Sequence, residues 1–166
     1  MARREAALSH VLRYGDPALR AAGRLVERFD GALAGEVERM SGLLEDALGA
    51  GLAATQLGVM HRVFVYRAEP DGPIGVMVNP EVEWASEHAE VDEEGCLSIP
   101  GVWVPVERPA EVRMRGRDAA GRERTVEAEG MEARVLQHEL DHLDGILMLE
   151  RTTKDARREA IRALRS

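Results

Sequence analysis

The sequence His138-Glu139-Leu140-Asp141-His142 constrains the fold of this chain more than any other feature. Two histidines four positions apart on a helix project from the same face, one turn apart, where both imidazoles can reach one metal ion. Glu139 would then lie beside that ion as a candidate base. Apolar residues around the pattern, followed by Gly145, predict a helix over 131–144. The alternative is an exposed helical face on which the histidines stand among ordinary charges.

A catalytic metal needs a third protein ligand and one open position, and several residues compete for that role. One large class of metallopeptidases extends the motif to a third histidine, but Met148 occupies that place here. Other metallopeptidases use a downstream glutamate. Glu150 follows the motif closely and Glu159 lies in a basic tail, so neither is well placed. Both glutamates stay open as third ligands, and Cys96 is a further candidate.

Cys96 is the only cysteine, so no disulfide can form within the chain. A single cysteine is either a small buried side chain that only packs, or a residue whose thiol takes part in chemistry such as metal binding. Its thiolate is a soft, strongly binding metal ligand, and the preceding Gly95 permits an unusual backbone approach. The best assembly that the sequence offers is a site made by Cys96, His138 and His142.

The segment Gly49-Ala50-Gly51-Leu52-Ala53-Ala54-Thr55-Gln56 is small and apolar until its last residue. Small residues let another backbone come close, so an extended peptide could add alongside this segment as a strand. Gln56 could donate a hydrogen bond to a carbonyl oxygen without adding charge near a metal. The alternative is a helix terminus followed by tight packing. A phosphate loop is excluded because the G-K-[ST] ending is missing.

The rest of the chain predicts short strands between helices. Apolar residues at helical spacing after Asp30 predict a helix over 31–48. Strands are expected over 62–66, 74–78, 102–106, 110–116 and 122–128, and a last helix over 153–166. This order predicts an α+β fold: a single domain over 1–166, with mostly antiparallel strands around a central metal-binding helix and with N-terminal and C-terminal helices.

Composition excludes several classes of protein. The 166 residues leave little room for a second core, and 45% hydrophobic residues suffice for one. A formal charge of −8 and a pI near 5.2 argue against binding of specific DNA. No apolar stretch approaches the roughly 18 residues of a membrane span, and no signal peptide follows Met1. We therefore expect no membrane partner and a cytoplasmic protein.

Three segments together resemble the peptide deformylase family, whose motifs are G-x-G-x-A-A-x-Q, E-G-C-x-S and H-E-x-D-H. They stand here at 49–56, 94–98 and 138–142, in the family's order. The resemblance extends from the sequence Leu-Arg-Tyr-Gly-Asp-Pro-Ala-Leu-Arg at 12–20 to Gly145-Ile146-Leu147, and so covers nearly the whole chain. It implies a metal-dependent hydrolase that removes the N-formyl group from the N-terminal formyl-methionine of newly synthesised polypeptides and releases formate.

The site residues that the resemblance implies fall into three groups. The metal ligands are Cys96, His138 and His142. The catalytic residues are Glu139, which handles the proton of the attacking water, and Gln56 and the backbone N–H of Leu97, which bind the formyl oxygen. The substrate-binding residues are Ala50, Gly51, Gly95, Met131 and Val135, of which the last two line the pocket for the methionine side chain.

The same resemblance implies one divalent metal ion. Fe²⁺ is the first expectation, and the ligand set also suits Zn²⁺, Ni²⁺ or Co²⁺. Two positions depart from the family pattern: Ala50 stands where isoleucine is frequent, and Trp103 stands where some members have an arginine. The effect of these two residues, and with it the preference for residues beyond methionine, is left open by the sequence.

The C-terminal segment 151–166 is basic. It carries six bases against two acids, a net charge of +4, which leaves −12 for the rest of the chain. One interpretation is a solvated amphipathic helix with Ala160, Ile161 and Leu164 facing the body. The other, implied by the resemblance, is that this basic helix docks on the ribosome, close to the N-formyl-methionyl nascent peptides.

Two other functions stand beside the deformylase interpretation. The H-E-x-x-H pattern alone also fits a zinc peptidase that cuts internal peptide bonds, which would not require Cys96 for metal binding. A binding protein that keeps the fold and has lost catalysis is the third. The presence of Glu139, Gln56 and all three ligands argues against it, since binding alone does not require that set.

Overall fold

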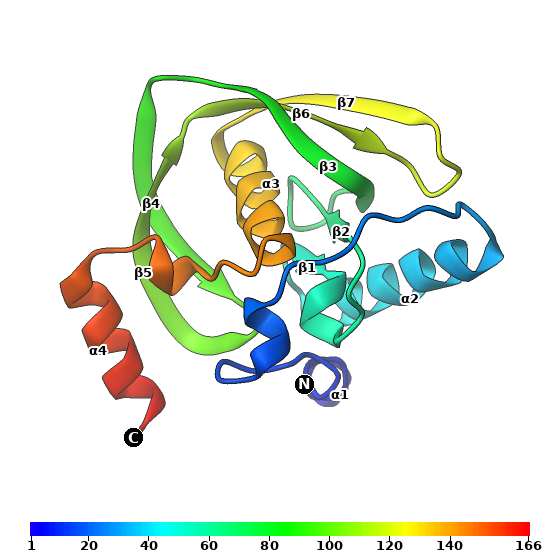
Figure 1. Cartoon of the computed structure of the whole chain (residues 1–166). Helices are drawn as coiled ribbons and strands as arrows, with labels where there is room; N and C mark the ends of the chain where they lie inside the picture. Colours follow the sequence, from blue (N-terminus) through cyan, green and yellow to red (C-terminus); the bar gives the residue numbers. More distant parts are fainter.

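The computed structural model describes all 166 residues (Figure 1). The helices are α1 (Ala2–Leu8), α2 (Gly31–Ala47), α3 (Gly130–Leu143) and α4 (Lys154–Leu164). The strands are β1 (Gly51–Ala53), β2 (Val63–Tyr66), β3 (Gly75–Ala85), β4 (Ala89–Cys96), β5 (Ile99–Pro109), β6 (Glu111–Arg117) and β7 (Glu123–Glu129). Short 3₁₀ turns span Pro17–Arg20, Ala54–Leu57 and Met148–Glu150. None of the helices combines the length and hydrophobicity that a membrane span needs.

The strands form two sheets, and every pair of neighbouring strands is antiparallel. A five-stranded sheet has the order β1-β2-β3-β6-β7, and β4 pairs with β5 in a separate two-stranded sheet. Figure 1 shows α3 in the middle of the molecule, surrounded by these strands, with α2 and α4 on opposite sides. The predicted α+β fold, with antiparallel strands around a central helix, is confirmed.

Helix α3 is central because its apolar side packs on the large sheet. Leu136 and Leu143 are fully buried, in one cluster with Phe64, Met77 and Met114. Truncating a buried leucine such as Leu136 to alanine costs about 2–5 kcal/mol. The remaining side of α3 also faces inward and carries polar side chains, so the helix presents chemistry to the interior of the molecule.

Gly145 ends α3 for a conformational reason. Its φ is +73°, in the left-handed region that favours glycine, and a β-carbon there would lie 2.6 Å from the backbone oxygen of Arg20. The predicted glycine stop is therefore confirmed, one residue beyond Asp144, which closes the helix.

Three elements were not predicted from the sequence: α1, β1 and β4. Two further strands are longer than expected, since β3 continues to Ala85 and β5 spans Ile99–Pro109. Strand β4 has the sequence Ala-Glu-Val-Asp-Glu-Glu-Gly-Cys and is largely exposed, so it lacks the apolar alternation that identifies a half-buried strand.

Helix α4 packs on the second sheet through a narrow apolar face. Ala160 is buried, and Ile161 and Leu164 pack against the cluster that includes Val104 and Val106 of β5. Thr153 caps the helix by accepting a hydrogen bond from the backbone N–H of Ala156. The predicted amphipathic helix is confirmed, and its arginines lie on the exposed side.

Candidate functional site

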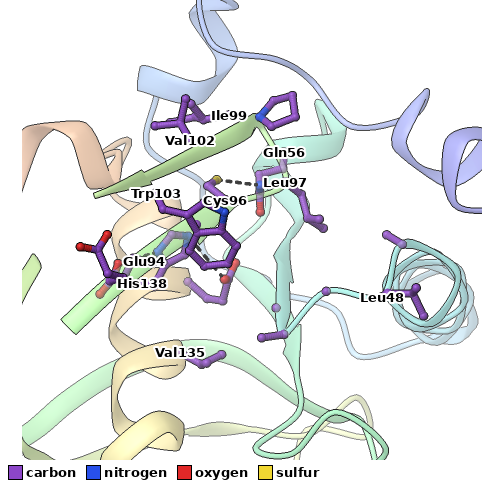
Figure 2. Close-up of a pocket in the computed structure, with 18 of the residues that line it drawn as sticks. Leu48, Gln56, Glu94, Cys96, Leu97, Ile99, Val102, Trp103, Val135 and His138 are labelled. Carbon is purple, nitrogen blue, oxygen red and sulfur yellow. Dashed lines mark hydrogen bonds and ion pairs between the residues drawn. The ribbon is translucent and has the colours of Figure 1, made fainter. Parts of the chain in front are cut away.

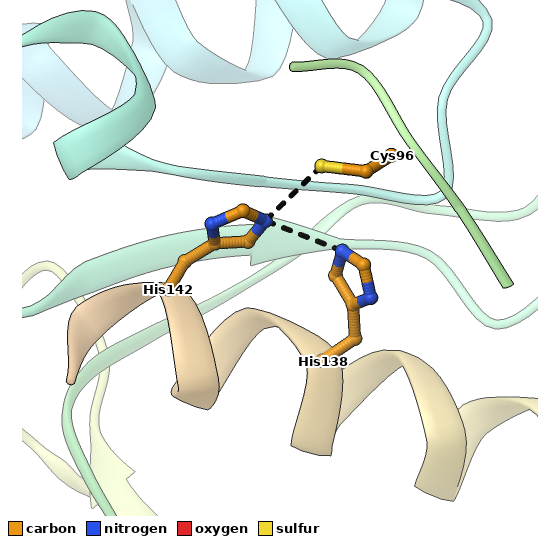
Figure 3. Close-up of side chains that lie close together, drawn as sticks. All are labelled: Cys96, His138 and His142. Atoms are coloured by element: carbon orange, nitrogen blue, oxygen red, sulfur yellow. Dashed lines mark hydrogen bonds between the residues drawn. The ribbon is translucent and has the colours of Figure 1, made fainter. Parts of the chain in front are cut away.

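Cys96, His138 and His142 come together in the structure (Figure 3). Their ligand atoms all lie within 4.8 Å of one another. The Sγ of Cys96 is 3.3 Å from Nε2 of His142, which is 3.2 Å from Nε2 of His138. The three atoms thus converge on one point, although Cys96 lies 42 and 46 positions before the two histidines in the sequence.

The local fold explains how these donors converge. His138 and His142 are one turn apart on α3, so their rings point in the same direction. Cys96 is the last residue of β4, where the ladder with β5 shifts its register between Gly95 and Cys96. That irregularity turns the cysteine side chain toward α3, and the two-residue turn Leu97-Ser98 then starts β5.

The three donors fit a divalent metal ion. A thiolate with two imidazoles is a set that binds zinc and other first-row transition metals, and three protein ligands leave one position open. Nδ1 of His138 lies 2.9 Å from Oε1 of Glu94, which fixes its proton on that side and leaves Nε2 as a lone-pair donor. Burial and the adjacent His138 hold the pKa of His142 well below its usual value, so this imidazole is neutral.

Glu94 orients His138 and is itself held by two buried arginines. Arg108 donates two hydrogen bonds to its carboxylate, and Nη1 of Arg134 donates a third at 2.8 Å. Burial opposes ionisation of Glu94, but the bonds from Arg108 and His138 outweigh that cost and lower its pKa to about 2. The carboxylate is therefore ionised. Burial lowers the pKa of His138, but the contacts of this ring with Cys96 and Glu94 outweigh burial and raise the pKa, so metal binding through Nε2 has to release a proton.

A second carboxylate continues this network toward the C-terminal tail. Asp141 of α3 accepts a hydrogen bond from Arg108 at 2.9 Å, and bonds at 3.1 and 2.9 Å from Arg151. Each buried charge thus has a partner of opposite sign, as buried charges require. The network ties β4, β5, α3 and Arg151, three residues before α4, into one rigid support for His138.

Glu139 lies beside the three donors without being one of them. Its Oε2 is 3.9 Å from Nε2 of His138, and its Oε1 is buried with no hydrogen-bond partner. Burial raises the pKa of this carboxyl to about 7, although His138 acts in the opposite direction. A carboxyl with a pKa near neutrality is suited to accept and return a proton.

Gln56 has its side-chain amide fixed at both ends. Its Oε1 accepts a hydrogen bond from the backbone N–H of Ala53 at 2.9 Å, which determines which end of the amide carries the NH₂ group. Its Nε2 then points to Oγ of Ser98 at 3.0 Å and toward Sγ of Cys96 at 3.7 Å. The amide is buried and presents its donor beside the sulfur of Cys96.

A pocket of about 660 Å³ opens onto these residues (Figure 2). Its lining includes every substrate-binding residue that the sequence predicted, namely Ala50, Gly51, Gly95, Met131 and Val135, together with Gln56, Leu97, Cys96, His138 and Glu139. His142 lies behind the other two ligands and does not line the pocket.

The side chains that line the pocket differ in solvent exposure between its depth and its mouth. Val135 is buried in its depth, whereas Met131 is 53% exposed and lies toward solvent. Leu48 and Trp103 are 75% and 70% exposed, and Figure 2 shows them on different sides of the pocket. The pocket is thus lined by large exposed apolar side chains toward solvent and by the buried Val135 in its depth.

Two strand edges border the pocket. Strand β1 is at the edge of the large sheet, and β4 pairs only with β5, so each has an edge without a partner strand. Gly51 belongs to β1 and Gly95 to β4, and both line the pocket. An extended peptide can pair with such edges through its main chain.

Sequence reasoning did not identify the residues that support the ligands. Glu94 and Asp141 were recognised only as parts of motifs, and Arg108 and Arg134 were not singled out. A signal was present for Arg108, since it continues the inward-facing series Val102, Val104 and Val106 along β5. A charged residue at an inward position of a strand needs a buried partner of opposite charge.

Comparisons with known proteins agree with this geometry. The model of the polypeptide deformylase family matches residues 8–158. A peptide deformylase from Clostridium botulinum is 44% identical over 148 residues, covering 89% of this chain and 99% of its own. One from Parafrankia is 43% identical over 151 residues, covering 91% of this chain and 82% of its own. The crystal structure of a peptide deformylase from Synechococcus elongatus in complex with actinonin superposes with a TM-score of 0.87 at 34% identity, covering 93% of this chain and 86% of that one.

The family match spans all three motifs that carry the site. It includes the helix with both histidines, the strand end with Cys96 and the segment that ends at Gln56. The chain therefore belongs to the polypeptide deformylase family, whose members are hydrolases that remove N-formyl groups.

Proposed function

We propose that this chain hydrolyses the formamide bond of N-formyl-methionyl peptides, with a divalent metal held by Cys96, His138 and His142. The observation that carries the proposal is the convergence of these three donor atoms within 4.8 Å, at a pocket that also contains the buried carboxyl of Glu139. A metal ion in this set supplies Lewis acidity that activates water and polarises a carbonyl oxygen. The remaining steps belong to residues of the chain.

Glu139 is the residue that moves the proton. It takes a proton from the attacking water as the water oxygen bonds to the formyl carbon. It returns the proton to the amine nitrogen as the carbon–nitrogen bond breaks, so the products are formate and a free amino terminus. The pKa of about 7 that burial imposes suits both transfers near neutral pH.

Gln56 and the backbone N–H of Leu97 bind the formyl oxygen as negative charge develops on it. The amide of Gln56 is held in place by Ala53 and Ser98, so its N–H group needs no reorganisation during the reaction. Leu97 lies in the turn between β4 and β5 and lines the same pocket. Fixed donors of this kind are worth about 2.7–4 kcal/mol each in other acyl-transfer sites.

The peptide binds in the pocket between two strand edges. Its backbone pairs with Ala50 and Gly51 on one side and with Gly95 on the other, as strand addition requires. The methionine side chain enters the part of the pocket lined by Val135 and Met131. A formyl group carries only hydrogen on its carbonyl carbon, so a crowded site excludes acetyl groups by size.

The physiological metal is proposed to be Fe²⁺, with Zn²⁺, Ni²⁺ and Co²⁺ as ions that the same donors accept. The reaction is proposed to take place in the cytoplasm, on nascent chains. We also propose that residues 1–166 act as one catalytic domain, in which 151–166 form a basic C-terminal helix. The exposed arginines of this helix would bind the ribosome, with Arg157, Arg158 and Arg162 as the groups that face solvent.

Ribosome binding can be tested without unfolding the tail. Replacing Arg157, Arg158 and Arg162 by glutamine removes charge and keeps the apolar face of α4 packed. Co-sedimentation with ribosomes at low salt should fall for this variant and for a chain that lacks 153–166. Equal sedimentation of all three proteins would remove the proposal for the tail and leave the catalytic proposal unaffected.

The catalytic proposal is tested by formate release. The protein is purified without oxygen, supplied with Fe²⁺ or Ni²⁺, and given an N-formyl-methionyl tripeptide or its N-acetyl analogue. Formate release from the first and no hydrolysis of the second supports the proposal. If protein with bound metal hydrolyses neither peptide, the proposed reaction is wrong.

A further inference from the structure

Helix α1 contributes a wall of the active-site pocket, and the family match includes only its last residue, Leu8. Arg4 and Leu8 are one turn apart on the same face of α1, and both line the pocket next to Leu48 and Gly49. The family model begins to match at residue 8, so Arg4 lies outside the matched part of the chain. The pocket is thus extended by a helix of which only the last residue lies within the matched part of the chain.

Arg4 is held in place by one hydrogen bond, yet most N–H groups of its guanidinium remain free to bind a ligand. Its Nε donates to the backbone oxygen of Ala47 at 3.3 Å, at the end of α2. The side chain is exposed and forms no ion pair, whereas the neighbouring Arg3 pairs with Asp46 at 3.4 Å. A guanidinium has five N–H donors in a planar fork, and a carboxylate can accept two of them at once.

The other charged side chains around the pocket are not free to bind a carboxylate of a ligand. Glu94, Arg134 and Glu139 are buried and belong to the network and the catalytic group described above. Only Arg4 and Glu93 are exposed among the charged residues of the lining, and they stand on different walls, α1 and β4. Arg4 is therefore the one exposed cation in the lining of the pocket.

We propose that Arg4 binds an acidic side chain of the peptide substrate downstream of the formyl-methionine. This inference rests on the proposed function, since it assigns a preference to the same site. The pocket of about 660 Å³ extends from Glu139 to Arg4, so it accommodates residues beyond methionine. The chain then favours substrates with aspartate or glutamate at the position that reaches α1, and α1 is part of the substrate site.

The test compares glutamate with glutamine, which has the same shape without the charge. N-formyl-methionyl peptides carry one or the other at the second, third or fourth position, and kcat/KM is measured at low ionic strength. In the wild-type enzyme the glutamate peptide is preferred at one of these positions. Arg4→Gln lowers that preference about two- to fivefold, through KM, which is the range of a solvent-exposed ion pair.

Two matched variants separate charge from structure. Arg4→Lys keeps the charge and preserves most of the preference. Arg3→Gln removes a neighbouring charge that does not line the pocket, and leaves the preference unchanged. Raising the salt concentration to about 0.5 M weakens the wild-type preference, because exposed charges are screened over a few ångströms. If Arg4→Gln changes the glutamate and glutamine peptides equally at every position, Arg4 only supports the end of α2 and the proposal is wrong.

A binding measurement distinguishes this proposal from the proposed function. Calorimetry with the unformylated peptides Met-Ala-Glu-Ser and Met-Ala-Gln-Ser, and with glutamate moved to positions 2 and 4, needs no catalysis. A preference for glutamate that Arg4→Gln removes supports the proposal, even if no formate is released. Equal affinities for all peptides in the wild-type protein overturn it, whatever the enzyme does with formylated substrates.

Discussion

Gly51 touches the carboxyl group of Glu139 so closely that a β-carbon at position 51 would lie 2.5 Å from Oε2. The second glycine of the G-x-G segment therefore has a structural role besides the peptide binding proposed for it. It leaves the space in which the carboxyl of Glu139, the proposed proton carrier, lies, and thereby links the strand edge of β1 to α3.

Gly51→Ala should displace the carboxyl of Glu139 and lower kcat by about 100-fold, because a base misplaced by an ångström loses most of its effect. Bound metal should remain, since Glu139 is not a ligand. The matched control is Gly35→Ala, where the added β-carbon meets nothing within 4 Å and the helix should be stabilised by roughly 0.5–1 kcal/mol. Unchanged kcat in Gly51→Ala would contradict the position assigned to Glu139.

Glu139→Gln should reduce formate release by about 10²–10⁴-fold, the contribution of a positioned acid–base group. Glutamine keeps the size of the side chain and cannot accept the proton. Metal content, measured by elemental analysis, should equal that of the wild-type protein. A variant that retains more than a tenth of the activity would show that another group moves the proton.

Gln56→Leu should lower kcat by about 10²–10³-fold, as expected for the loss of one donor to a developing negative charge. Ser98→Ala is the comparison, because Ser98 only accepts a hydrogen bond from the Gln56 amide and should cost less than tenfold. Both variants should hold their metal. If Gln56→Leu affects KM alone, the amide binds substrate and does not stabilise the transition state.

Glu94 should make stability depend on acid pH. Its pKa is about 2 in the folded protein against 4.5 for a free carboxyl, so the ionised form stabilises the fold. Its contribution, about 3 kcal/mol, is complete above pH 4.5 and is lost as the pH falls from 4.5 to 2. Urea unfolding of the metal-free protein measures this difference between the wild-type protein and Glu94→Gln.

Glu94→Gln should be less stable at pH 7 by about 3 kcal/mol or more, since Arg108 and Arg134 lose a buried partner. The deficit should shrink toward pH 2. Glu87→Gln, at an exposed position without an ion pair, should follow the wild-type curve throughout. A deficit for Glu94→Gln that is constant from pH 5 to pH 2 would mean that Glu94 titrates normally in the folded state.

The elements that could be predicted from the sequence are those with a recognisable local spacing of residues. The spacing of His138 and His142 predicts a helix and a shared ligand direction, and the lone Cys96 completes the set because few other residues can bind a metal strongly. Strands β2, β5, β6 and β7 were predicted to within three residues at each end, whereas β3 was predicted only over its first part. The glycine that ends α3 was predicted at its position.

Long-range pairing explains what the sequence did not reveal. Strand β4 is acidic and exposed, and it is a strand because β5 pairs with it. Helix α1 is short and rests on α2, so its seven residues carry too little pattern of their own. The partners of Glu94 are 14 and 40 positions away, and only the fold brings Arg108 and Arg134 to one carboxylate.

The most direct test of the account is the dependence of formate release on bound metal. Protein stripped by a chelator without oxygen is titrated with Fe²⁺ or Ni²⁺, and activity toward an N-formyl-methionyl tripeptide is measured beside the metal content. We predict that activity rises in proportion to bound metal and saturates at one ion per chain, and that Cys96→Ala neither retains the ion nor releases formate. Full activity in the stripped protein, or in Cys96→Ala, would contradict it.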